Sequence, residues 1–94
     1  MAAVYILYSP VLDRFYTGSC IDFEQRFQDH QSKKYIDSFT SNASDWELYL
    51  RIDKLSYRQA RAIERHIKKM KSRIYIENLL KYPEMVQKLI NRYK

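Results

Sequence analysis

The sequence of 94 residues has one glycine, one cysteine and two prolines. With so few residues that favour sharp turns, it contains no low-complexity linker, and no internal repeat is visible. The lone Cys20 cannot form a disulfide within the chain, so a reducing, cytoplasmic setting is expected, with Cys20 as a small residue at a strand end. No apolar run approaches the ~18 residues of a membrane span and no signal-peptide pattern opens the chain, so no membrane partner is expected.

Hydrophobic residues make up 46% of the chain, which supports one modest core and argues against disorder. The length predicts one domain, residues 1–94. The net charge of +6 is unevenly spread, with −3 over residues 1–50 and +9 over residues 51–94. A basic second half interleaved with tyrosines suits a polyanion such as nucleic acid. The alternative is a solvated helical surface, where lysine and arginine serve solubility alone.

Two short β-branched and aromatic segments predict a β-hairpin, with strands over residues 3–8 and 15–19 joined by a loop. If the numbers of the residues that pair across the hairpin add to an odd total, Tyr5 and Tyr16 share one face, with Gly18 beside them. Gly18 is then expected to mark a close approach of backbone or ligand. A third strand is predicted over 45–52, where Trp46, Leu48, Leu50 and Ile52 alternate with Glu47, Tyr49 and Arg51.

Capping patterns predict where the first two helices begin. Asp22 followed by Gln25 predicts a helix to about Gln31, and the polar residues 32–45 predict a long loop. Ser56 followed by Gln59 predicts a helix over 57–71.

Two short helices are predicted after residue 71. They cover residues 74–81 and 84–93, separated by Tyr82-Pro83, because proline disfavours helix in the residue before it and suits a first turn. The order β-β-α-β-α-α-α predicts an α+β fold in which helices cover a small sheet.

Two of these helices turn polar residues toward the predicted core. At about 100° per residue, Arg26 and His30 lie on the same arc as Phe23 and Phe27. Glu64 lies within the apolar arc of the helix over 57–71, which is formed by Tyr57, Ala60, Ile63, Ile67 and Met70. A carboxylate facing a core is costly unless it is paired or bound to a cation. A structural salt bridge between Glu64 and Arg26, with His30 at the core edge, is the plain interpretation.

The same residue types can also serve phosphodiester hydrolysis. A carboxylate can hold Mg²⁺ while leaving room for water and phosphate, and an arginine fork matches phosphate geometry. A tyrosine or histidine within hydrogen-bond reach of a water can act as its base. Tyrosine is also an ordinary strand residue, so Tyr5 and Tyr16 alone do not decide between packing and chemistry.

The residues carry a resemblance to a known family. Val4-Tyr5-Ile6, then Tyr16-Thr17-Gly18, then Arg26 and His30, and finally Glu64 on a later helix together resemble the GIY-YIG nuclease domain. The chain is most similar to the short, stand-alone bacterial members, over about residues 3–80, with residues 83–94 as a C-terminal helix. The resemblance implies a three-stranded antiparallel sheet flanked by helices and a single-metal nuclease site.

The resemblance also assigns roles to individual residues. It implies that Tyr5 helps to activate the attacking water and that Tyr16 orients water or phosphate. It also implies that Arg26 stabilises the phosphoryl charge, and His30 stands where relatives have histidine or tyrosine. Glu64 matches the metal ligand of the family, so the resemblance implies that it binds a divalent metal, Mg²⁺ or Mn²⁺. Arg26 and His30 would then face inward because the site lies between their helix and the hairpin.

Three positions depart from the family pattern. Val4 replaces the first glycine, Thr17 replaces the central isoleucine of the second motif, and Ser19 stands where some repair members have a lysine. Asn78 is a candidate for the asparagine that follows the glutamate helix in many relatives, or else an exposed or capping residue. Nucleic-acid contacts are expected from Lys68, Lys69, Lys71, Arg73 and Asn78. For the four basic residues the alternative is a solvated helix end.

The sequence therefore predicts a metal-dependent endonuclease, with DNA as the expected partner, although it does not separate DNA from RNA. The alternative is a nucleic-acid-binding module that keeps the fold without turnover. A structural dimeric protein is a third class, which would not bind polyanions at low salt. No separate DNA-reading motif is visible, so selectivity for DNA structure is expected, and a partner protein is another source of specificity. The sequence leaves the oligomeric state open.

Overall fold

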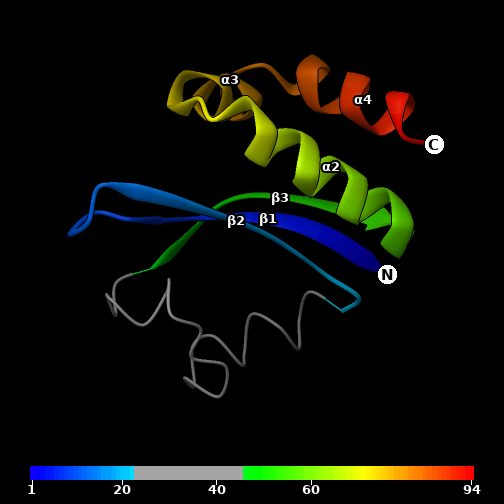
Figure 1. The fold of residues 1–94 in the computed structure, drawn as a ribbon, viewed down its shortest axis with the longest axis horizontal. Helices are drawn as coiled ribbons and strands as arrows, with labels where there is room; N and C mark the ends of the chain where they lie inside the picture. The colour runs from blue at the N-terminus through cyan, green and yellow to red at the C-terminus, as the bar shows by residue number, and fades with distance from the viewer. Residues whose placement is uncertain (23–45) are drawn as a thin grey trace.

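The computed structural model describes residues 1–22 and 46–94. In this part of the chain, three strands form an antiparallel sheet and three helices pack on one side of it, which confirms the predicted α+β class (Figure 1). The elements are β1 (Ala2–Ser9), β2 (Arg14–Cys20), β3 (Glu47–Leu55), α2 (Tyr57–Met70), α3 (Arg73–Lys81) and α4 (Pro83–Arg92). The predicted helix from Asp22 to about Gln31 and the predicted loop over 32–45 lie outside the described residues, apart from Asp22.

The strand order β2-β1-β3 places β1 in the centre and β2 at an edge. In the β1–β2 hairpin the numbers of paired residues add to an odd total, with Tyr5 opposite Gly18 and Leu7 opposite Tyr16. Side chains alternate along a strand, so the sheet has two faces, and this register determines which residues of β1 and β2 share each face. Tyr5 and Tyr16 share one of them, as predicted.

The main core lies between the sheet and the helices. Val4 and Ile6 of β1 pack against the fully buried Ile63 and Ile67 of α2. Burying an aliphatic side chain of this kind stabilises the fold by about 1.5–3 kcal/mol. A smaller cluster on the opposite face contains Ala3, Tyr5, Leu7 and Cys20, with Tyr16 and Trp46 packed against it.

The predicted alternation of β3 is wrong at its first half. Leu50 and Ile52 face the main core, but Trp46 packs in the cluster on the opposite face. The cause is an irregularity in the pairing with β1, which shifts register between Ile6–Leu50 and Leu7–Leu48. One extra residue reverses the direction of every side chain before it. The strand also continues to Leu55, beyond the predicted end at residue 52.

The helix starts follow the predicted capping residues. The Ser56 hydroxyl accepts a hydrogen bond from the Gln59 amide at 3.1 Å, and Pro83 occupies the first turn of α4. The apolar arc of α2 is narrower than predicted, because Tyr57 and Met70 at its two ends are 42% and 46% exposed.

Candidate active site

The two motif tyrosines lie side by side on the sheet face that points away from α2. Their ring centroids are 6.4 Å apart with an interplanar angle of 37°. Tyr5 is only 3% exposed, whereas Tyr16 is half-buried and meets Trp46 edge to face at 6.4 Å. The hairpin therefore presents two phenol groups to one region, which is the arrangement the sequence predicted.

Gly18 is required for space rather than for an unusual backbone conformation. Its φ is not positive. A Cβ atom at this position would lie 2.6 Å from the Tyr5 hydroxyl oxygen and 2.7 Å from Tyr5 Cζ. The predicted close approach at Gly18 is thus made by the side chain of the first motif tyrosine.

Glu64 lies on α2 and reaches the edge strand of the sheet. Its side chain is 21% exposed, so the carboxylate is largely but not wholly removed from water. The Ser19 hydroxyl donates a hydrogen bond to Oε1, and the Lys68 ammonium lies 2.7 Å from Oε2. Both carboxylate oxygens therefore have partners among the described residues, as a half-buried charge requires.

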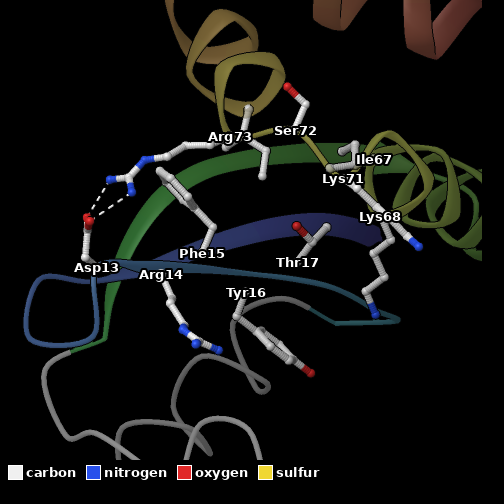
Figure 2. Close-up of a pocket in the computed structure, with 11 residues that line it drawn as sticks. Asp13, Arg14, Phe15, Tyr16, Thr17, Ile67, Lys68, Lys71, Ser72 and Arg73 are labelled. Atoms are coloured by element: carbon white, nitrogen blue, oxygen red, sulfur yellow. Dashed lines mark hydrogen bonds and ion pairs between the residues drawn. The ribbon is translucent and has the colours of Figure 1, made fainter.

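The candidate site lies around the edge of β2 rather than on one face of the sheet. Ser19 and Thr17 point toward α2, whereas Tyr16 and Gly18 point to the other face, because their partners on β1 do. Lys68 connects the two sides, since its ammonium contacts Glu64 and also lies 6.0 Å from the centroid of the Tyr16 ring. Figure 2 shows the Lys68 side chain extending from α2 toward β2.

Two predicted site residues, Arg26 and His30, lie outside the described residues. The predicted pairing of Arg26 with Glu64 and the convergence of the full set are therefore expectations still. The described part of the site consists of Tyr5, Tyr16 and Glu64, with Ser19 and Lys68 as the direct partners of the carboxylate.

Ser19 is the residue whose role the sequence analysis missed. The family pattern marks Ser19 only as a position where some relatives have a lysine, yet the Ser19 hydroxyl donates a hydrogen bond to Glu64, the predicted metal ligand. The alternation of side chains along β2 could have predicted this contact. If Tyr16 and Gly18 point to one face, Ser19 must point to the other, toward α2 and Glu64.

The chemistry of the donor set is compatible with one divalent cation. The residues in the described ranges contain no group of three or more His, Cys, Asp or Glu side chains that could enclose a metal. Mg²⁺ does not need such a cage, because it commonly binds through one or two carboxylates and keeps waters and phosphate oxygens as its other ligands. Glu64 could provide the carboxylate, and the Lys68 ammonium group would compete with the cation at Oε2.

The residues predicted to contact nucleic acid separate into two groups. Lys68, Lys71 and Arg73 line a groove along the edge strand, next to Tyr16 (Figure 2). Lys69 and Asn78 are not among the residues that line it. Lys69 is exposed on α2 and its charge instead lowers the pKa of His66. Asn78 accepts a hydrogen bond from the Tyr82 amide through its backbone oxygen at the end of α3.

The far end of the groove is fixed by a salt bridge between the hairpin loop and α3. Arg73 contacts both carboxylate oxygens of Asp13, at 2.9 and 2.5 Å, and the Tyr8 hydroxyl donates to the same carboxylate at 2.5 Å. These two donors hold the pKa of Asp13 below its usual range, and the carboxylate raises the pKa of Tyr8. Tyr8 is therefore a structural phenol, unlike the two motif tyrosines on the opposite face.

The chain belongs to the GIY-YIG catalytic domain family, whose model matches residues 1–78. Members of this family are nucleases that hydrolyse phosphodiester bonds, so the protein is an enzyme of that class and its substrate is a nucleic acid. Neither the comparison with curated proteins nor that with solved structures gave a match. Among the described residues, no helix is long and apolar enough to cross a membrane.

Proposed function

We propose that the protein is a metal-dependent endonuclease that cuts DNA and selects for DNA structure rather than sequence. The observation that carries this proposal is the position of Glu64, a half-buried carboxylate held at the edge of β2 by Ser19 and by Lys68, whose ammonium group also lies near the Tyr16 ring. A carboxylate, two tyrosine hydroxyls and an adjacent ammonium group are suited to phosphodiester hydrolysis.

The roles proposed for the residues follow from their positions. Glu64 would hold Mg²⁺ or Mn²⁺, which when bound supplies positive charge for the phosphoryl and leaving oxygens. Tyr5 and Tyr16 supply hydroxyls on one face that position the attacking water and a phosphate oxygen. Arg26 is proposed to neutralise the phosphoryl group, on the resemblance alone. His30 is proposed to assist proton transfer, because a histidine within reach of the water can act as its base.

We also propose that residues 1–94 act as one nuclease unit. The family match ends at residue 78, but Leu89 of α4 is buried in the same cluster as Ile63 and Ile67. Removing α4 would expose that part of the core.

A non-catalytic nucleic-acid-binding module is the second candidate. The observation in its favour is that Ser19 and Lys68 already occupy both oxygens of Glu64. A carboxylate with two protein partners is what a module that binds no metal would contain. The two candidates differ in whether a divalent cation displaces Lys68.

The test is cleavage of labelled single-stranded, duplex, flap and branched DNAs, and of RNA, with Mg²⁺, with Mn²⁺ and with chelator. Wild type is compared with Glu64→Ala, with Arg26→Ala and with Glu77→Ala, a matched control because Glu77 is exposed on α3. Metal-dependent cutting that the first two substitutions abolish and the control retains supports the endonuclease. Binding without cutting, equal in wild type and Glu64→Ala, supports the module instead.

A further inference from the structure

A groove runs along the edge strand from the candidate active site to the Asp13–Arg73 salt bridge (Figure 2). Its volume is about 480 Å³, within the ~300–1,000 Å³ typical of pockets for small ligands. Tyr16 and Lys68 line one end of the groove, so it is continuous with the residues around Glu64. A ligand in the groove would therefore be in contact with the site itself.

The groove combines an apolar lining with a positively charged rim. Ile67, Ile76 and Phe15 contribute apolar side chains, while Arg14 and Lys71 stand among the cations that line it. A heterocyclic base or sugar suits the first kind of surface, and a phosphate suits the second. The charge favours an anion over a neutral or basic peptide.

The cations of the rim are not equally available to a ligand. Lys68 is paired with Glu64, and Arg73 is paired with Asp13. Arg73 also lies 5.5 Å from the centroid of the Phe15 ring, so it forms a fixed wall of the groove rather than a mobile charge. Within residues 1–22 and 46–94, Lys71 makes no ion pair, which leaves its ammonium group available to an incoming phosphate.

The backbone is unusual at both sides of the groove. Asp13 and Lys71 have φ values of 52° and 48°, in the left-handed region that favours glycine. Only one other non-glycine residue in the described part of the chain, Lys54, has a positive φ, and it does not line the groove. Because Lys71 stands where glycine would cost less, replacing it by glycine removes the side chain without straining the backbone.

We propose that the groove is a subsite for one unpaired nucleotide next to the phosphodiester that is cut, with its base or sugar against the apolar lining and its phosphate on Lys71. This inference rests on the proposed nuclease function and adds the substrate class. A base that is stacked in a duplex would have to leave its partner and its neighbours to enter, which is energetically unfavourable. The subsite therefore favours single strands, flaps and the ends of nicks.

Lys71→Gly is the test variant, with Lys54→Gly as its matched control. Both changes remove one lysine, and both place glycine at a positive φ, so neither should harm folding. In chelator, where no cutting occurs, Lys71→Gly is expected to weaken binding of a single-stranded oligonucleotide roughly 5- to 10-fold. Lys54→Gly is expected to leave this affinity unchanged, and blunt duplex is expected to respond little to either. Fluorescence anisotropy measures all these affinities.

A second measurement locates the contact on the oligonucleotide. Phosphates are replaced one at a time by neutral methylphosphonates, and bases by abasic positions. One methylphosphonate next to the cut position should weaken binding to wild type but not to Lys71→Gly. One abasic position beside it should weaken binding to both proteins, because the apolar lining is unchanged.

The results separate this inference from the proposed function. Cutting that is intact while Lys71→Gly and Lys54→Gly bind every oligonucleotide equally well would overturn the subsite and keep the nuclease. Loss of single-strand binding in Lys71→Gly but not in Lys54→Gly, with no cutting under any condition, would support a nucleotide site in the groove and overturn the proposed nuclease function. Equal weakening by both glycine variants would show a general charge effect and would also overturn the subsite.

Discussion

Ser19 on the edge strand and Glu64 on α2 are joined by a hydrogen bond in which the serine hydroxyl donates to Oε1. The two residues are 45 positions apart in the chain. This contact fixes the orientation of the carboxylate relative to the sheet that carries Tyr5 and Tyr16. The other oxygen, Oε2, contacts the ammonium group of Lys68, which a metal cation could replace.

Replacing Ser19 by alanine should lower turnover more than stability. The hydrogen bond to a charged group contributes about 1.5–3 kcal/mol to holding the carboxylate, so turnover should fall roughly 10-fold or more. Ser19→Thr keeps the hydroxyl on a residue that suits a strand, and it should recover most of the activity. Single-turnover cleavage and urea unfolding of the three proteins measure the two quantities. Equal activity of the alanine and threonine variants would contradict the role given to the hydroxyl.

Replacing Gly18 by alanine should destabilise the protein. The new Cβ would lie within 2.7 Å of Tyr5 Oη and Cζ, and the Tyr5 ring is too buried to move away freely. Overpacking of this kind typically costs about 1–3 kcal/mol in the free energy of unfolding. Urea unfolding measures the cost, and the same substitution made in a Tyr5→Leu background should cost clearly less. An equal cost in both backgrounds would show that the strain has another source.

Replacing Lys68 by methionine should tighten Mn²⁺ binding to the protein alone. The pair with Glu64 is partly exposed and spaced i,i+4, which is worth about 0.3–0.5 kcal/mol. Releasing the carboxylate from it should therefore increase Mn²⁺ affinity about twofold. Lys69→Met removes the same charge from an exposed neighbour and is the control. Calorimetry or manganese EPR gives the affinities, and identical values for the two variants would mean that Lys68 does not compete with the metal.

His66 should make the protein less stable in mild acid. Burial lowers its pKa, with Arg92 and Lys69 acting in the same direction, and Nδ1 lies 2.8 Å from the Tyr93 hydroxyl oxygen. The folded protein therefore prefers neutral His66, whereas the unfolded chain binds a proton near pH 6.5. Stability should be full above that pH and should decrease as pH falls through 6.5 toward the lower folded pKa. Thermal unfolding from pH 8 to 5 tests this, and His66→Gln should flatten the curve.

The acid response of Asp13 should occur in a separate pH range. Its pKa is held below the usual value by Arg73 and Tyr8, so its contribution is present above about pH 4 and is lost only below it. Asp13→Asn should remove this lower step while leaving the step from His66 unchanged.

The hairpin, the helix starts and the position of Glu64 could be predicted from the sequence because each depends on local patterns. Strand alternation and the odd sum of paired residues place Tyr5 beside Tyr16, and a serine three residues before a backbone amide defines the start of α2. The 3.6-residue period places Glu64 beside Ile63 and Ile67 at the edge of the core. In these three cases residues that are close in the sequence determine the local structure.

The rest depends on contacts between distant parts of the chain. The register shift in β3 is set by its pairing with β1, so the reversal at Trp46 leaves no local signal. The groove requires Asp13 to meet Arg73, 60 residues away, and Lys71 to adopt a conformation that its own sequence disfavours.

The packing of α4 separates two definitions of the minimal enzyme. A version cut at residue 78 would contain the whole family match, but it would lack Leu79 and Leu89, both of which are buried in the main core. It would also lack Tyr93, the partner of His66. Anyone fusing this nuclease to a DNA-targeting module should therefore attach the linker after the last helix and not at the edge of the recognisable motif.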